Sequence, residues 1–114
     1  MRTTVNVRAV ALLALGLLSA VAVLGLARQP TPDLVWDRIA DCESGGDWHA
    51  NTGNGYYGGL QIWLPTWVDA GGLRYADRPD RAGRVQQVAV GEEILRRQGW
   101  QAWGSCARQL GLLA

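Results

Sequence analysis

The stretch WDRIADCESGGDW, residues 36–48, has the pattern of an amphipathic helix with a sharp end. Trp36, Ile39 and the alanine after it recur at the spacing that places side chains on one helix face. Glu43 continues this apolar stripe one turn later. The Gly-Gly pair at residues 45–46 then stops the helix. The stretch therefore predicts a helix that packs on a core and carries a carboxylate near its end.

Upstream of this helix, an uncharged apolar run at residues 9–27 follows two arginines. Two interpretations of residues 1–27 stay open: a secretory signal peptide, or a membrane anchor of nearly the required length of about twenty residues. Both place the rest of the chain outside the cytoplasm, with membrane contact only through residues 9–27 if they are uncleaved. We therefore expect a secreted protein, or one anchored in the membrane with its domain outside. Residues 28–33 form a linker, in which Asp33 is the expected N-cap.

Glycine and proline divide the following residues into short elements. The turn-forming stretch NTGNGYYGG, residues 51–59, and a brief strand at 60–62 predict a minor β-hairpin. Pro65 opens a short helix that ends at the glycines 71–72, and a third helix is expected at about residues 83–97. The side chains of this third helix expected to face inward are Val85, Val88, Ala89 and Leu95. The predicted fold class is α+β, mostly α, with one small domain.

The composition excludes several classes of function. The 114 residues suffice for one domain. The 11 basic and 10 acidic residues are interspersed, so the chain has no strong positive electrostatic field that would attract nucleic acid. The sequence holds no phosphate-binding glycine motif. One histidine and two cysteines do not make up the usual ligand set of a zinc site. We therefore expect no metal, no cofactor and no nucleic-acid partner, and a monomer.

The cysteines, Cys42 and Cys106, are interpreted as structural rather than reactive. A domain of about eighty residues is marginal for a core without a covalent link, and export favours oxidation. Closing a loop of this length contributes about 4 kcal/mol in the chain-entropy model. A disulfide that pins the C-terminal segment to the first helix is therefore expected.

Glu43 is a candidate general acid. Proximity to the core and to the negative end of the helix dipole both raise the pKa of a carboxyl group, as a general acid near neutral pH requires. A helix-end glutamate that turns into solvent is the alternative, and periodicity alone favours it. The six tryptophans and three tyrosines, with no phenylalanine, favour an acid beside a sugar-binding surface, because Trp and Tyr combine flat faces with a polar group. Uncharged side chains suited to hydroxyl and acetamide groups complete a predicted polysaccharide groove: Asn51, Thr52, Asn54, Gln61, Thr66 and Gln98.

Three stretches resemble the resuscitation-promoting factor domain: residues 36–48, residues 51–61, and the closing Gln98-Gly99-Trp100 with Ala102-Trp103 and Cys106. The resemblance covers residues 34–107 and leaves 108–114 as a short tail. It implies a lysozyme-like catalytic domain, related to goose-type lysozymes and soluble lytic transglycosylases. It also implies a secreted or surface-bound protein that cleaves cell-wall peptidoglycan and stimulates the regrowth of dormant cells. Peptidoglycan glycan strands are then the expected partner, and another cell-wall hydrolase is a further candidate.

The resemblance implies roles for individual residues. Glu43 matches the family's catalytic acid, and Thr66 matches the threonine beside it in the cleft. Cys42 and Cys106 match the family's disulfide. The positions that line the groove in the family correspond here to Gln61, Trp67, Gln98, Asn51, Tyr56 and Trp48. The main departure is IWLP at residues 62–65, where the family has an aromatic followed by short polar residues, and we expect it to affect subsite preference.

The predicted reaction is cleavage of the β-1,4 bond from N-acetylmuramic acid to N-acetylglucosamine, with Glu43 protonating the leaving oxygen. Asp41 and Asp47, the carboxylates nearest in sequence, are interpreted as solvated, and so is His49. Two second steps stay open: attack by the substrate's own 6-hydroxyl, which gives an anhydro product, and attack by water. A non-catalytic glycan-binding or signalling module with the same groove is the alternative function.

Overall fold

The computed structural model describes residues 29–114, so the predicted signal peptide or anchor at 1–27 lies outside the described residues. Thr31–Ala114 form one compact unit. Its elements follow in the order α2 (Asp33–Ser44), β1 (Tyr56–Tyr57), β2 (Ile62–Trp63), α3 (Leu64–Asp69), the 3-10 helices η1 (Gly72–Arg74) and η2 (Pro79–Arg81), α4 (Arg84–Gln98), the 3-10 helix η3 (Gly99–Trp103) and α5 (Gly104–Gln109). The predicted fold class is confirmed: the domain is mostly helical, with a two-stranded antiparallel hairpin. No helix within the described range is long and apolar enough to cross a membrane.

Helix α2 begins and ends where local sequence dictates. Its N-cap is Pro32 and not Asp33, because proline holds an extended backbone there and makes Asp33 the first helical residue. Asp33 still places a negative charge in the first turn, where the helix dipole favours it. At the other end, Gly45 adopts a left-handed conformation with φ 66°, and its N–H bonds the carbonyl of Asp41. The predicted stop at the glycine pair is confirmed.

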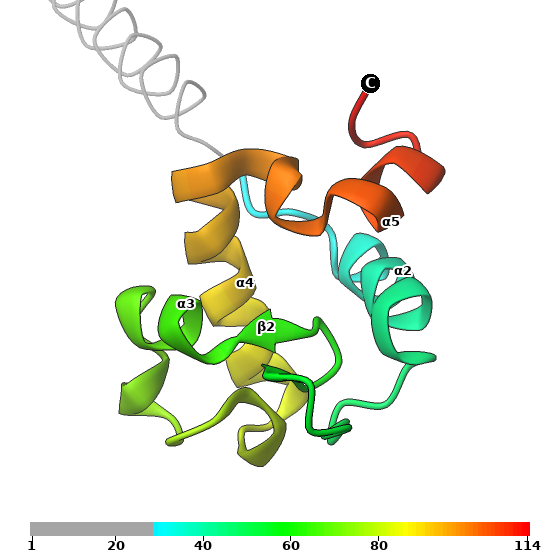
Figure 1. Cartoon of the computed structure of the whole chain (residues 1–114). Helices are drawn as coiled ribbons and strands as arrows, with labels where there is room; N and C mark the ends of the chain where they lie inside the picture. Colours follow the sequence, from blue (N-terminus) through cyan, green and yellow to red (C-terminus); the bar gives the residue numbers. More distant parts are fainter. Residues whose placement is uncertain (1–28) are drawn as a thin grey trace, which may run out of the picture. The chain divides into compact units, whose positions relative to one another are not determined.

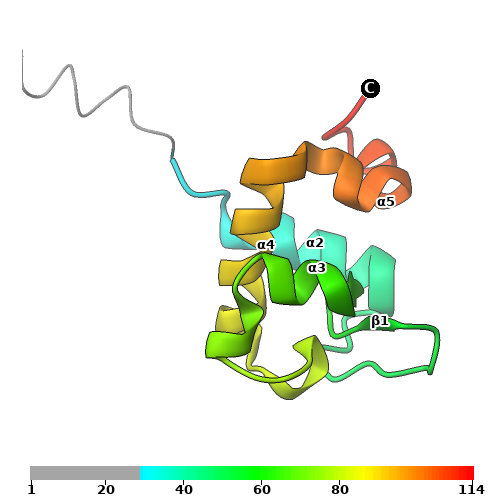
Figure 2. The same cartoon turned by 60° about the vertical axis from the view of Figure 1, so that its left-hand side comes forward.

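Helices α2 and α5 lie side by side and are covalently joined (Figures 1 and 2). Cys42 of α2 and Cys106 of α5 form the expected disulfide, with their Cα atoms 5.8 Å apart. The predicted bridge is confirmed, and it ties the C-terminal segment to the first helix. Beyond the bridge, the chain continues along the domain, since Leu110 and Leu112 pack against the core.

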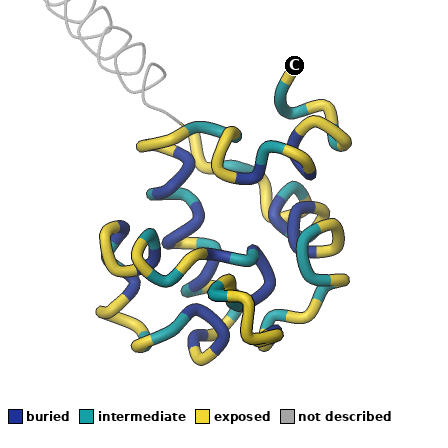
Figure 3. The backbone as a smooth tube through the Cα atoms, viewed as in Figure 1, coloured by how far each residue is buried: buried dark blue, intermediate teal, exposed yellow. Residues whose placement is uncertain are grey.

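Tryptophans form the centre of the core. Trp36 of α2 is fully buried and lies 5.2 Å from Trp103 and 5.4 Å from Trp100, measured between ring centres. The indole N–H of Trp36 donates a 2.8 Å hydrogen bond to Glu92 of α4, so the largest buried ring of α2 keeps its polar atom satisfied. Ile39 is also fully buried, as the apolar stripe predicted. Buried positions, dark blue in Figure 3, recur along α2 and α4.

The inward face of α4 differs from the predicted one. The buried residues of this helix are Gln87, Val90, Gly91, Ile94 and Leu95. Of the four expected inward residues only Leu95 is buried: Val85 is 75% exposed, Ala89 is exposed and Val88 is half-buried. The prediction followed apolar side chains, whereas the buried stripe contains a hydrogen-bonded glutamine and a glycine. Which residues of α4 are buried depends on the segments that pack against it, and the apolar periodicity of the helix alone does not identify those segments.

Gly91 is a point of close approach between α4 and the rest of the core. A Cβ at this position would lie 2.9 Å from Cδ1 of Leu60 and 3.2 Å from the ring of Trp36. Both neighbours are fully buried, so neither can move out into solvent. The glycine therefore lowers the helix propensity of α4 but permits the close packing that holds α2 and the hairpin together.

Candidate functional site

A cavity of about 260 Å³ opens between the hairpin, α3 and the end of α4. Its lining residues are Tyr56, Gln61, Ile62, Trp63, Thr66, Ile94, Gln98, Gln101, Ala102 and Trp103. The structure thus brings together four of the residues expected at the groove: Gln61, Thr66, Gln98 and Tyr56. They come from separate elements, and their side chains offer amide, hydroxyl and phenol groups but no charge. Such a surface can hydrogen-bond the hydroxyl and acetamide groups of a glycan.

Gln61 reaches the cavity from a strained backbone. It is the only non-glycine residue in the described part of the chain with a positive φ, 50°. Its side-chain nitrogen donates a 3.0 Å hydrogen bond to the carbonyl of Gly58, and its backbone N–H bonds the same carbonyl at 3.3 Å. These two bonds offset the strain and fix the side chain at the turn before β2. Residues held in this way against their backbone preference are frequent at binding sites.

Two aromatic side chains form one wall of the cavity. Tyr56 of β1 pairs directly with Trp63 of β2, and both point away from the core, 45% and 52% exposed. Aromatic rings left in solvent beside a polar cavity are suited to stacking on sugar rings. Trp63 was not predicted as a site residue. The sequence signal that could have found it is strand alternation: Ile62 is buried, so the next residue, Trp63, points to the opposite, solvent-facing side of the hairpin.

Glu43 occupies the next-to-last position of α2, half-buried on the same helix face as Ile39 and Ala40. Burial raises its pKa above the ordinary glutamate value, which is the direction expected. The neighbouring Ser44 hydroxyl lies 2.9 Å from the carbonyl oxygen of Gly59 and so ties this end of α2 to the turn that carries Gln61. Glu43 itself is not among the lining residues of the cavity. The Ser44 bond nevertheless holds the end of α2 beside the turn that carries Gln61.

Three further predicted groove residues lie elsewhere. Trp67 is fully buried and donates its indole N–H to the carbonyl of Ala76 at 2.9 Å, so it is a core residue of α3. Trp48 is half-buried, and its ring covers Gly59, where a Cβ would lie within 2.4 Å of the indole. Asn51 is exposed, and its side-chain oxygen accepts a hydrogen bond from the turn. None of these three side chains lines the cavity.

The other ionisable residues near Glu43 in sequence have local structural contacts. The carboxylate of Asp47 accepts a 2.9 Å hydrogen bond from the backbone N–H of His49. The ring of His49 lies 3.0 Å from the carbonyl oxygen of Asp80, so the histidine is engaged in the turn. Asp41 is exposed. Within residues 29–114, no aspartate or glutamate lines the cavity that Tyr56 and Trp63 border.

Comparison with known proteins identifies the family. Residues 31–106 match the family described as transglycosylase-like domain. The chain is 48% identical over 94 residues to resuscitation-promoting factor Rpf1 of Corynebacterium glutamicum, which covers 82% of this chain and 49% of that protein. It is 51% identical over 76 residues to RpfB of Mycolicibacterium smegmatis, and this match covers 67% of this chain and 21% of the relative. It is 44% identical over 94 residues to Rpf of Micrococcus luteus, and this match covers 82% of this chain and 40% of the relative. The chain therefore belongs to the resuscitation-promoting factor family, with a transglycosylase-like domain, and the resemblance seen in its motifs is confirmed. It spans about half or less of the length of these relatives.

Proposed function

We propose that this protein is an exported, peptidoglycan-cleaving glycosidase in which Glu43 is the general acid. The observation that carries the proposal is the environment of Glu43, which is half-buried, so that burial raises its pKa. Its helix end is tied by Ser44 to the turn beside an uncharged cavity with aromatic side chains in its wall. A protonated carboxyl group near neutral pH is what cleavage of a glycosidic bond requires. Family membership supports the same reaction class. The Cys42–Cys106 disulfide supports an oxidising, extracellular location.

In the proposed reaction, the glycan lies along the cavity with its sugar rings against Tyr56 and Trp63. The amides of Gln61 and Gln98 hydrogen-bond its hydroxyl and acetamide groups. Glu43 gives its proton to the bridging oxygen between N-acetylmuramic acid and N-acetylglucosamine while the bond from that oxygen to C1 breaks. Positive charge develops at C1 as an oxocarbenium-like transition state forms. The leaving sugar departs with a new hydroxyl group, and Glu43 is left as a carboxylate.

The second step regenerates the acid. An oxygen nucleophile attacks C1, and its proton passes to the Glu43 carboxylate, which returns to its starting state. No carboxylate lines the cavity within the described residues, so a covalent glycosyl–enzyme intermediate has no nucleophile there. The nucleophile is then the 6-hydroxyl of the substrate or a water molecule, and we assign Thr66 the role of orienting it by hydrogen bonding.

The experiment that tests this function is mass spectrometry of purified peptidoglycan after digestion by the wild-type protein and by Glu43→Gln. The glutamine keeps the size of the side chain but has no acidic proton to transfer. Anhydromuramyl products from the wild type alone would support a lytic transglycosylase that acts through Glu43, and reducing muramyl ends would support hydrolysis. Equal product release by both proteins would contradict the role of Glu43. Thermal unfolding and a thiol assay show that both proteins are folded and bridged.

A second candidate function is glycan binding without cleavage. It is favoured by one observation: Glu43 does not line the cavity, whereas the amide and aromatic groups do. If the protein is such a module, the wild type and Glu43→Gln should bind peptidoglycan equally well and stimulate regrowth equally, and neither should release products. Loss of both cleavage and regrowth stimulation in Glu43→Gln would exclude it. Pull-down with a second cell-wall hydrolase tests whether such an enzyme is a partner in either case.

A further inference from the structure

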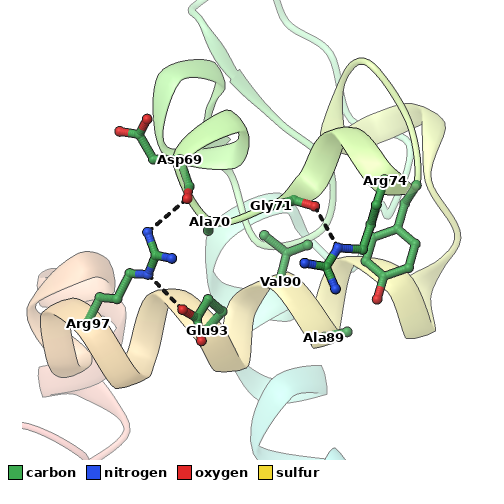
Figure 4. Close-up of a pocket in the computed structure, with 9 residues that line it drawn as sticks. Asp69, Ala70, Gly71, Arg74, Ala89, Val90, Glu93 and Arg97 are labelled. Atoms are coloured by element: carbon green, nitrogen blue, oxygen red, sulfur yellow. Dashed lines mark hydrogen bonds and ion pairs between the residues drawn. The ribbon is translucent and has the colours of Figure 1, made fainter.

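A second cavity, of about 280 Å³, lies outside the proposed glycan site, between the end of α3, η1 and one face of α4 (Figure 4). Ala70, Ala89 and Val90 form an apolar floor. Arg74 and Arg97 lie toward opposite ends of this floor, as Figure 4 shows. A cavity with guanidinium groups at its ends and methyl groups between them suits a small anion that has an apolar body.

Arg74 is positioned for a ligand by its own surroundings. Its Nε donates a 3.2 Å hydrogen bond to the carbonyl of Gly71, and its guanidinium carbon lies 5.9 Å from the centre of the Tyr75 ring. Gly71 permits this position, because a Cβ there would lie 3.0 Å from Nη2 of Arg74. No carboxylate in residues 29–114 forms an ion pair with Arg74. Its two terminal nitrogens therefore keep the donor geometry that carboxylates prefer.

The opposite end of the cavity is organised by an ion-pair network with net positive charge. Arg96 and Arg97 both bond the carboxylate of Glu93, at 2.7 Å each, and hold its pKa at about 2. Nη1 of Arg97 also donates a 2.8 Å hydrogen bond to the carbonyl of Asp69, and this bond fixes the guanidinium across the cavity. Asp69 also lines the cavity but turns its carboxylate away from the floor, as Figure 4 shows, and the Glu93 carboxylate is shared by two arginines. Neither carboxylate therefore cancels the positive potential that Arg74 creates.

We propose that this second cavity binds the free carboxyl end of a short peptide with small apolar side chains, as carried by the stem peptides of peptidoglycan. The carboxylate pairs with Arg74, and the methyl groups of the peptide cover Ala70, Ala89 and Val90. A phosphate would leave the apolar floor uncovered, and an uncharged sugar would leave Arg74 without a partner. The assignment of wall peptide as the source rests on the proposed function, since it is the glycan strand that brings the stems to this domain.

The two cavities are close enough to serve one substrate. Thr66 in the glycan cavity and Ala70 in the second cavity are four residues apart, and Gln98 and Arg97 are adjacent on α4. One helical turn rises about 5.4 Å, whereas an extended peptide of four residues spans roughly 13 Å. A stem attached to a sugar in the first cavity is therefore long enough to pass α3 and enter the second cavity.

The test is a calorimetric titration of the purified, disulfide-bonded protein with N-acetyl-D-alanyl-D-alanine and with its C-terminal amide. We expect the free carboxylate to bind at least about tenfold more tightly than the amide, and Arg74→Gln to remove this difference. Arg38→Gln is the matched control, because Arg38 is an exposed arginine of α2 that does not line the second cavity. Ala89→Glu, a substitution at an exposed helix position, places a negative charge on the floor and should abolish binding with Arg74 intact.

Several outcomes would overturn the proposal. Equal affinity for the carboxylate and the amide, or unchanged affinity in Arg74→Gln, would show that Arg74 does not bind the carboxylate. Tighter binding of the L,L form of the dipeptide would exclude wall stems as the source. The titration is independent of glycan cleavage, so Glu43→Gln should bind the dipeptide as the wild type does. A wild type that cleaves glycan but does not bind the dipeptide would refute this inference alone.

Discussion

The side-chain oxygen of Gln87, on the buried face of α4, accepts a 2.9 Å hydrogen bond from the backbone N–H of Gly59. The nitrogen of the same amide donates to the carbonyls of Trp48 and Ala82, at 2.8 and 2.9 Å. One fully buried glutamine thus joins α4 to the turn that precedes Gln61. The position of that turn, and with it one wall of the cavity, depends on a side chain that lies far away in sequence.

We predict that Gln87→Met destabilises the protein by about 2–4 kcal/mol, because it leaves one donor and two acceptors of the backbone without partners. The volume of the side chain is nearly unchanged, so the loss reports the hydrogen bonds and not a cavity. Chemical denaturation measures it. Gln101→Met, at an exposed position of η3, serves as the control and should unfold at the wild-type denaturant concentration.

Gly91→Ala is expected to destabilise the protein by about 1–3 kcal/mol, although alanine is the better helix former. The new methyl group would be 2.9 Å from Leu60 and 3.2 Å from the ring of Trp36, and both side chains are packed. Gly104→Ala in α5 is the matched control, since the new methyl group would lie 3.5 Å from its nearest neighbour, the flexible side chain of Arg108. A stabilised Gly91→Ala protein in thermal unfolding would mean that the core has room that the structure does not contain.

Trp63→Ala should weaken the binding of an N-acetylglucosamine oligomer by about 1 kcal/mol, or roughly fivefold in Kd, through loss of ring stacking. Its effect on stability should be small because the indole is 52% exposed. Fluorescence titration gives the affinity, and Val85→Ala, a change at an exposed position of α4, is the control. Unchanged affinity would assign Trp63 to some other surface contact.

The raised pKa of Glu43 predicts the sign of a pH effect on stability. Because the folded state holds its proton more tightly than the unfolded state, the wild type loses stability as the pH rises from the ordinary value of 4.5 through the raised one. Glu43→Gln cannot ionise, so its stability relative to the wild type should increase over this same window. Urea denaturation of both proteins at pH 4, 5, 6 and 7 measures the difference. A difference independent of pH would place Glu43 in solvent.

The same group predicts the activity profile. Cleavage that needs a protonated Glu43 should decline on the alkaline side as the pH passes the raised pKa of this residue. Lowering the ionic strength should change this midpoint little, because burial, and not a neighbouring charge, raises the pKa. The rate of product release from peptidoglycan, measured across pH at two salt concentrations, provides the comparison.

Local features of the sequence determined the elements that depend on neighbouring residues. The stripe of Trp36 and Ile39 and the glycines at 45–46 were enough to place α2, because helix periodicity and a left-handed stop are properties of consecutive residues. The disulfide followed from two cysteines in a domain that we expected to be exported, and the ordered motifs at residues 36–48 and 51–61 identified the family.

Only the tertiary structure decided which side chains share a surface. Gln61 comes from the turn before β2, Thr66 from α3 and Gln98 from α4, and the three meet in one cavity. Trp67, next to Thr66, turns into the core instead. On α4, the partners Gly59, Leu60 and Trp36 made Gln87 and Gly91 the buried positions and left Val85 in solvent. The physical reason is that burial and hydrogen bonding are satisfied by residues distant in the chain, and a local pattern carries no information about which partner arrives there.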